Sequence, residues 1–257
     1  MSCPQWTLSA GRVAGTSHKI RGIPCQDDAI HRSLVCNGFI AAVSDGAGSG
    51  RLTHWASGIA VRSVTWSIAR ELNSGTPLSP EIVRTSLTSA TADIHLLEER
   101  CRLAGMQVRT HDFACTCIVT VLQSNRLIVA QIGDGAVVAN VDGRLSCLSA
   151  SPDREYVNET TFLVSESAIE DLHIREMDTV NMSGLAIMTD GVQHLAIRYP
   201  ANEPYDRFFW PLFDHATRNV ERPEAERNRE LTEFLDTPAI NAETDDDKTL
   251  LSAVRSA

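Results

Sequence analysis

Aspartates at the ends of apolar runs are the feature that most restricts how this chain can fold. Three apolar runs end in Asp-Gly, at Asp45, Asp134 and Asp190. A fourth run begins at Thr249, shortly after the three consecutive aspartates 245–247. If these four ends lie together, each carboxylate contact at ~4 Å costs about 4 kcal/mol at an effective dielectric constant of about 20. Such an arrangement calls for a divalent cation among the carboxylates.

Asp-Gly is also a favoured turn pair, so a single occurrence predicts no more than a turn. Asp142-Gly143 illustrates that alternative, because it lies between two short alternating segments. Asp45 and Asp190 differ, since each follows a run too apolar for an edge strand and precedes sequence that offers no matching hairpin partner. Oxygen ligands without a His or Cys cluster favour magnesium or manganese over zinc. A glycine after each aspartate also lets the backbone carbonyl approach an ion.

Composition and charge exclude several other classes of protein. The 257 residues suffice for one large domain or two small ones, and a composition of 43% hydrophobic and 22% charged residues is typical of a soluble globular protein. No obvious linker divides the chain, so we expect a single domain spanning 1–257. A net charge of −10 argues against nucleic acid or an anionic membrane as a partner. The opening MSCPQWTLSAGR lacks the basic and apolar regions of a signal peptide, so we expect a cytoplasmic location. Seven scattered cysteines without a CxxC pair predict neither a disulfide framework nor a zinc site.

Periodicity predicts two long helices followed by a series of strands, then further helices and a last strand. Helical spacing runs from 52 to 72, and Ser79-Pro80-Glu81 predicts the start of a second helix that ends near 103. Strands are expected at 38–46, 112–123, 126–135, 136–141, 144–148, 183–191 and 249–254, and polar helices near 205–217 and 223–234. Several strands follow one another through short turns, which argues against a parallel sheet built from βαβ units. The fold class is therefore α+β, with sheets packed on each other and helices outside.

One segment of this pattern is ambiguous. RFFWPLFDHA (207–216) concentrates aromatic and apolar side chains around Pro211. Packing against the core is favoured over the two alternatives, which are a docking surface for a partner and a lid over the site.

Six motifs in order along the chain resemble those of the PPM, or PP2C-type, metal-dependent protein phosphatases, and the bacterial-type branch in particular. They are GTSHKIRGIPCQDDA (15–29), AAVSDGAGSG (41–50), DFACT (112–116), QIGDGAVV (131–138), LAIMTDGV (185–192) and TDDDKTLL (244–251). Each motif alone is weak, but six in the right order over nearly the whole chain are specific. The resemblance implies a four-layer α-β-β-α sandwich of two antiparallel sheets flanked by helices.

The resemblance also implies roles for individual residues. Asp45 would bridge two Mg²⁺ or Mn²⁺ ions, with the Gly46 carbonyl on one of them, and Asp190 would complete the other site. In the last motif Asp246 matches a metal ligand, while Asp247 occupies a position that is asparagine in the family pattern, Thr249 matches the hydroxyl position, and Asp245 is left in a second layer or in solvent. Asp27 would act through metal-bound water, and Asp134 could hold a third ion.

The chain departs from the family pattern at three places. Ala47 stands where many members carry a histidine proposed to protonate the leaving oxygen, so water or another group must donate that proton. Gln26 replaces an acidic residue. Gly22 stands at the position of the phosphate-binding arginine, which makes the neighbouring Arg21 the first candidate for that role and His18 the second. For both candidates the alternative is a plain surface or loop residue.

Two functions from different classes follow. The preferred one is a phosphoprotein (Ser/Thr) phosphatase in which a hydroxide bridging two Mg or Mn ions attacks phosphorus. Its partner would be a phosphorylated protein, either a cognate Ser/Thr kinase or that kinase's target. The alternative, suggested by Gln26 and Ala47, is a catalytically weak phosphatase-fold module that binds a kinase or phosphoprotein. A third reading is a two-metal hydrolase of small phosphate esters.

Overall fold

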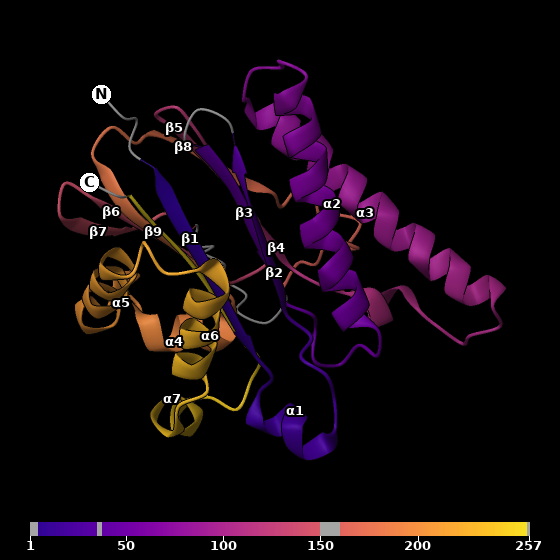
Figure 1. Ribbon diagram of the computed structural model, residues 1–257. Coiled ribbons are helices and arrows are strands. Elements are labelled where there is room, and N and C mark those ends of the chain that lie inside the picture. Colours follow the sequence, from indigo (N-terminus) through magenta and orange to yellow (C-terminus); the bar gives the residue numbers. More distant parts are fainter. Residues whose placement is uncertain (1–4, 35–37, 150–159, 256–257) are drawn as a thin grey trace.

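The computed structural model describes residues 5–34, 38–149 and 160–255, in which two five-stranded antiparallel sheets face each other (Figure 1). The first sheet has the order β1 (Trp6–Val13), β12 (Lys248–Arg255), β9 (Met182–Met188), β6 (Ala136–Val141) and β7 (Arg144–Cys147). The second has the order β2 (Asp28–Leu34), β3 (Gly38–Ser44), β4 (Cys117–Gln123), β5 (Arg126–Ile132) and β8 (His173–Asp178). A short pair, β10 (Ile197–Arg198) and β11 (Glu203–Pro204), forms a separate two-stranded sheet.

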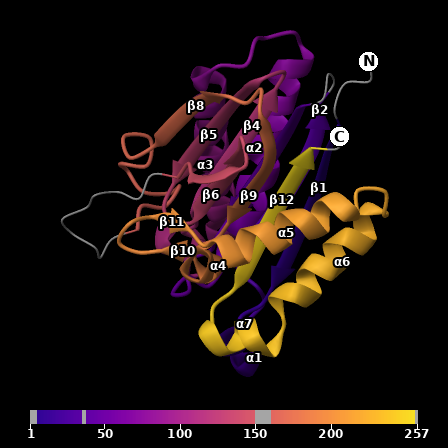
Figure 2. The same ribbon diagram turned by 90° about the vertical axis from the view of Figure 1, so that its left-hand side faces the viewer.

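Helices cover the outer face of each sheet. The second sheet is covered by α2 (Thr53–Asn73) and α3 (Pro80–Leu103), and the first by α5 (Asp206–Arg218) and α6 (Glu224–Leu235) (Figures 1 and 2). Shorter helices are α1 (Thr16–Arg21), α4 (Asp190–Ala196), α7 (Pro238–Glu243) and the 3₁₀ helix η1 (Thr110–Phe113). In the described part of the chain, no helix is both long and apolar enough to cross a membrane.

Three apolar layers hold this arrangement together. One lies between α2, α3 and the second sheet, one between the two sheets, and one between the first sheet and α4, α5 and α6. In β12, neighbouring residues contribute to different layers, because successive side chains of a strand point to opposite faces of the sheet. Leu251 belongs to the layer between the sheets, whereas Leu250 belongs to the layer under the helices. The predicted α-β-β-α sandwich is confirmed.

The helix predictions hold at their ends as well as in their middles. Ser79 caps α3 by accepting a hydrogen bond from the Ile82 N–H (3.4 Å), and Pro80 is the first helical residue. A capping side chain satisfies one of the four N–H groups that a helix start leaves unpaired. In the ambiguous segment 207–216, which forms most of α5, Phe209 and Phe213 are buried against the first sheet. The favoured interpretation, packing on the core, is confirmed.

Several boundaries differ from the expectation. Residues 112–123 do not form one strand, because η1 covers the start and β4 begins only at Cys117. The chain turns into α4 at Asp190, so the strand expected at 183–191 ends at Met188. Strands β1, β2 and β8 were not predicted. All three lie at sheet edges, and β8 is largely exposed, so the apolar signal of a buried strand is weak or absent there.

We predict that Leu251→Ala lowers the free energy of unfolding by roughly 2–5 kcal/mol, since it removes a fully buried side chain and leaves a cavity between the sheets. Leu103→Ala is the matched control, because Leu103 is 81% exposed, and its effect should stay within about 0.5 kcal/mol. Urea unfolding monitored by circular dichroism measures both. Equal effects of the two substitutions would contradict the layer assignment.

Candidate functional site

Asp45 follows β3 and is fixed to the segment that precedes β4. Its N–H donates to Thr116 Oγ1 (3.1 Å), and its carbonyl accepts from the Thr116 N–H (2.8 Å). Gly46 forms an isolated antiparallel bridge with Cys115. A Cβ at Gly46 would lie 2.7 Å from the Gln26 carbonyl oxygen, so the close approach requires glycine. This Asp-Gly pair is therefore a strand end held by two other segments, and not a hairpin turn.

Asp190 is the first residue of α4 and lies directly after β9, beside the start of β12. The Thr189 N–H donates to the Thr249 carbonyl (3.1 Å), and the Thr249 N–H donates to Thr189 Oγ1 (3.1 Å). The Thr189 hydroxyl in turn donates to Asp27 Oδ2 (2.8 Å). One threonine therefore joins the first, fifth and sixth motifs of the sequence.

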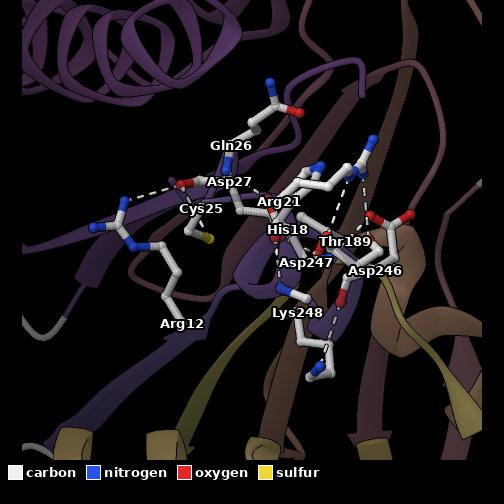
Figure 3. Close-up of polar contacts among 12 residues, drawn as sticks. Arg12, His18, Arg21, Cys25, Gln26, Asp27, Thr189, Asp246, Asp247 and Lys248 are labelled. Atoms are coloured by element: carbon white, nitrogen blue, oxygen red, sulfur yellow. Dashed lines mark hydrogen bonds and ion pairs between the residues drawn. The ribbon is translucent and has the colours of Figure 1, made fainter. Parts of the chain in front are cut away.

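A buried carboxylate, that of Asp247, ties the last motif to the first (Figure 3). Its Oδ1 accepts from the Gly15 N–H (2.7 Å) and lies 2.9 Å from His18 Nδ1. Its Oδ2 accepts from the Gln26 N–H (2.5 Å). Because Asp247 is only 2% exposed, these partners are what compensates the loss of water around its charge. The bonds hold the loop that carries Asp27 against the start of β12.

The remaining two acids come from the same end of the sandwich. Asp246 is exposed, and its Oδ1 accepts from the Asp247 N–H (2.8 Å). Asp134 lies between β5 and β6, where its Oδ2 accepts from the Thr160 hydroxyl (3.1 Å). Gln193 links α4 to the turn that carries Asp134. Its Oε1 accepts a hydrogen bond from the Gly135 N–H (2.8 Å), and Gly135 directly follows Asp134.

The acids act on one another electrostatically. Burial, followed by the neighbouring charges of Asp27, Asp134 and Asp246, raises the pKa of Asp45 well above its ordinary value. Burial and then Asp45, Asp134 and Asp246 raise the pKa of Asp190 to about 8. Burial is also the main cause that raises the pKa of Asp27 to about 7. Carboxyls from four distant parts of the chain therefore lie within one electrostatic neighbourhood.

The donor set at this end fits a hard divalent cation. Five buried side-chain oxygens from the motifs have no hydrogen-bond partner in the described part of the chain, namely Gln26 Oε1, Asp27 Oδ1, Gln131 Oε1, Asp134 Oδ1 and Thr249 Oγ1. Oxygen-only sites of this kind suit Mg²⁺ or Mn²⁺. Within the described ranges, however, no three or more His, Cys, Asp or Glu side chains are gathered tightly enough to enclose an ion. The carboxyls converge without closing into a coordination shell.

The structure separates the two candidates for binding phosphate. His18 is 3% exposed, and its ring faces the Asp247 carboxylate, so it serves to position that residue. Arg21 ends α1 and is exposed, with Nε donating to the Ser17 carbonyl (3.1 Å). Along the described chain, no ion pair joins the Arg21 guanidinium to an acid, and it remains the better placed of the two to meet an anion.

Sequence reasoning missed the neutral residues that hold the acids. Thr116 binds the backbone of Asp45, Thr189 binds the Asp27 carboxyl, and Gln193 links the turn that carries Asp134 to α4. The available signal was local, since Thr189 directly precedes Asp190 and Thr116 closes the DFACT motif. A lone threonine has too many possible partners for its role to be read without the fold.

A family model described as Protein phosphatase 2C matches residues 14–236. The chain belongs to the protein phosphatase 2C family. Serine/threonine-protein phosphatase 3 of Escherichia coli (strain K12) is 28% identical over 97% of this chain and 98% of that protein. Family and relative together identify a PP2C-type protein serine/threonine phosphatase, in a family of metal-dependent enzymes.

Solved structures show the same PP2C fold. The catalytic domain of serine threonine protein phosphatase PstP, in complex with two manganese ions, superimposes with a TM-score of 0.62 at 12% identity, covering 99% of this chain and all of that one. Serine/threonine phosphatase Stp1 from Staphylococcus aureus gives a TM-score of 0.61 at 12% identity, covering 97% of this chain and 95% of that one. Identities this low establish the fold alone.

We predict that the stability of the chelated protein falls as pH rises from about 4 to about 8. Carboxyls ionise near 3.8 when exposed, whereas Asp190 keeps its proton to about 8 in the fold. The folded state therefore binds more protons than the unfolded chain in this window, and the free energy of unfolding decreases with pH. Urea midpoints in EDTA across the window measure the slope.

Asp190→Asn should flatten that slope, because asparagine does not ionise, and Asp142→Asn in the β6–β7 hairpin should leave it unchanged. Added Mn²⁺ should raise the midpoint most at the alkaline end, since a cation stabilises the ionised carboxyls. A urea midpoint that increases with pH in EDTA would contradict this prediction, because it would show that the acids do not repel one another in the fold.

Proposed function

We propose that this phosphatase removes phosphate from serine or threonine of a partner protein with the help of two Mg²⁺ or Mn²⁺ ions. Asp45, the Gly46 carbonyl, Asp190 and Asp246 would hold the ions. Asp27 and Asp134 would act through water or hold a third ion. The ions would supply positive charge to the phosphoryl oxygens and lower the pKa of the attacking water.

One observation carries this proposal: the carboxyls of Asp27, Asp45 and Asp190 have raised pKa values in the fold, and the charges that add to burial at Asp45 and Asp190 include those of Asp134 and Asp246, from distant parts of the chain. Mutual repulsion of this kind is costly, and a fold that served only to bind a partner would not need it. The unpaired oxygens of Asp27 and Asp134 also point to a ligand beyond the protein itself.

The chain's own residues would orient the reaction. The Thr189 hydroxyl fixes the Asp27 carboxyl, which can then accept a proton from, or hydrogen-bond to, a water molecule in front of phosphorus. The exposed Arg21 would bind the phosphoryl group and position it for in-line attack. Ala47 cannot donate a proton, so the leaving serine or threonine oxygen would take its proton from water or another group.

The partner would be a phosphorylated Ser/Thr kinase or that kinase's target, acted on in the cytoplasm. Five cysteines of the described chain are free thiols, which suits a reducing compartment.

We predict that Asp45→Asn and Asp190→Asn each lower Mn²⁺-dependent hydrolysis of p-nitrophenyl phosphate by about 100-fold or more, since each removes a charge positioned at the reacting centre. Asp142→Asn is the matched control. Asp142 also precedes a glycine after an apolar run, but it lies in a hairpin at φ 53, where asparagine is tolerated, so activity should be retained.

Three outcomes would contradict parts of the proposal. Full activity in EDTA would exclude the metal-dependent mechanism. No turnover in the Mn²⁺-loaded wild-type chain, together with binding of a phosphothreonine peptide, would favour the regulatory module that Gln26 and Ala47 suggest. Faster hydrolysis of free small esters than of the phosphothreonine peptide would favour a small-molecule hydrolase.

We predict that Arg21→Ala raises KM for a phosphothreonine peptide by about tenfold and changes kcat less, because the guanidinium would bind the phosphoryl group in ground and transition states alike. Arg100→Ala, at an exposed position on α3, is the control and should leave KM unchanged. Steady-state phosphate release measures both constants. An unchanged KM in Arg21→Ala would remove Arg21 from the site.

A further inference from the structure

A cavity of about 630 Å³ lies under the helices on the first sheet, between α5, α6 and α7. Figure 2 shows that α5 and α6 diverge from the turn that joins them and that β12 passes behind α5. Its walls are apolar, with Leu195, Phe208, Leu212, Leu231, Phe234 and Ile240 among the lining residues. This volume is within the range of small-molecule sites, about 300–1,000 Å³.

The floor of the cavity is polar. Ser9 of β1 and Ser252 of β12 are directly opposite each other in the strand register, and both line the cavity. Ser252 is 2% exposed, yet in the described chain no side-chain hydrogen bond satisfies its hydroxyl. A hydroxyl that lines a cavity and makes no side-chain hydrogen bond within the described chain is a donor that a ligand can satisfy.

The floor also carries the guanidinium of Arg227, which forms no ion pair with an acid within the ranges that the structure describes. Arg227 of α6 donates to Ser9 Oγ (3.2 Å), to the Leu8 carbonyl (3.0 Å) and to the Arg222 carbonyl, which are all uncharged acceptors. The nearby Glu230 already pairs with His215 (3.1 Å) and Arg222. Charge complementarity at this floor therefore favours an anionic group on the ligand.

We propose that this cavity binds a monocarboxylic acid with a long unbranched apolar tail. The carboxylate would accept hydrogen bonds from Ser252 Oγ and from the Arg227 side. The tail would extend between α5 and α7 along Leu212, Phe234 and Ile240. The polar floor would thus bind the carboxylate of the ligand, and the apolar walls would bind its tail.

Dodecanoate, titrated into the full-length protein by isothermal calorimetry, tests the proposal. We expect saturable binding at one site per chain. Leu212→Trp, which fills the cavity, should weaken binding at least about tenfold, whereas Leu103→Trp, the same substitution at an 81% exposed position, should not. Ser252→Ala removes only the hydroxyl and should weaken binding about threefold to tenfold without disturbing the fold.

Dodecanol separates the two halves of the proposal, because it keeps the tail and lacks the charge. We expect it to bind at least about tenfold more weakly than dodecanoate. Equal binding of alcohol and acid would overturn the carboxylate assignment. No binding of dodecanoate, or equal binding by wild type and Leu212→Trp with unchanged thermal midpoints, would overturn the site. None of these measurements depends on turnover, so the outcome is independent of the proposed metal chemistry.

Discussion

Repulsion between carboxylates at one end of the sandwich is the constraint on which the site depends. Hydrogen bonds from surrounding segments hold the acids in place. Thr116 fixes the backbone of Asp45, Thr189 binds Asp27, and Asp247 accepts hydrogen bonds from the loop that carries Asp27. These hydrogen bonds offset the repulsion between the acids, and the pKa values of Asp27, Asp45 and Asp190 stay raised by burial and by neighbouring charges.

Much of this arrangement could be predicted from the sequence, because apolar runs ending in acids are a local and unusual pattern. Asp45 and Asp190 were singled out from the turn-forming Asp142 by the sequence that follows each glycine, and the structure places only Asp142 in a hairpin. The layer order could also be predicted, since the six motifs span the sheet ends of one known fold and the family match confirms it.

What could not be predicted depended on contacts between distant segments. The polar edge strand β8 resembles loop sequence when read alone, and becomes a strand only because β5 pairs with it. The aspartate at 247 occupies an asparagine position in the family pattern, and nothing local shows that two backbone N–H groups and His18 surround it. The close packing of α6 on β1 likewise depends on Gly11, since a Cβ there would lie 2.8 Å from the carbonyl carbon of Leu231.

The pairing of β1 with β12 has a consequence for the life of the protein in the cell. These strands lie at opposite ends of the chain, and β12 is flanked by β1 and β9 in the middle of its sheet. While the ribosome is still making residues 244–255, the sheet has a gap, and the acid at 246 is not yet in place. The first sheet can therefore close only after residues 248–255 have been synthesised, which makes the joining of β1 to β9 through β12 a late step of folding.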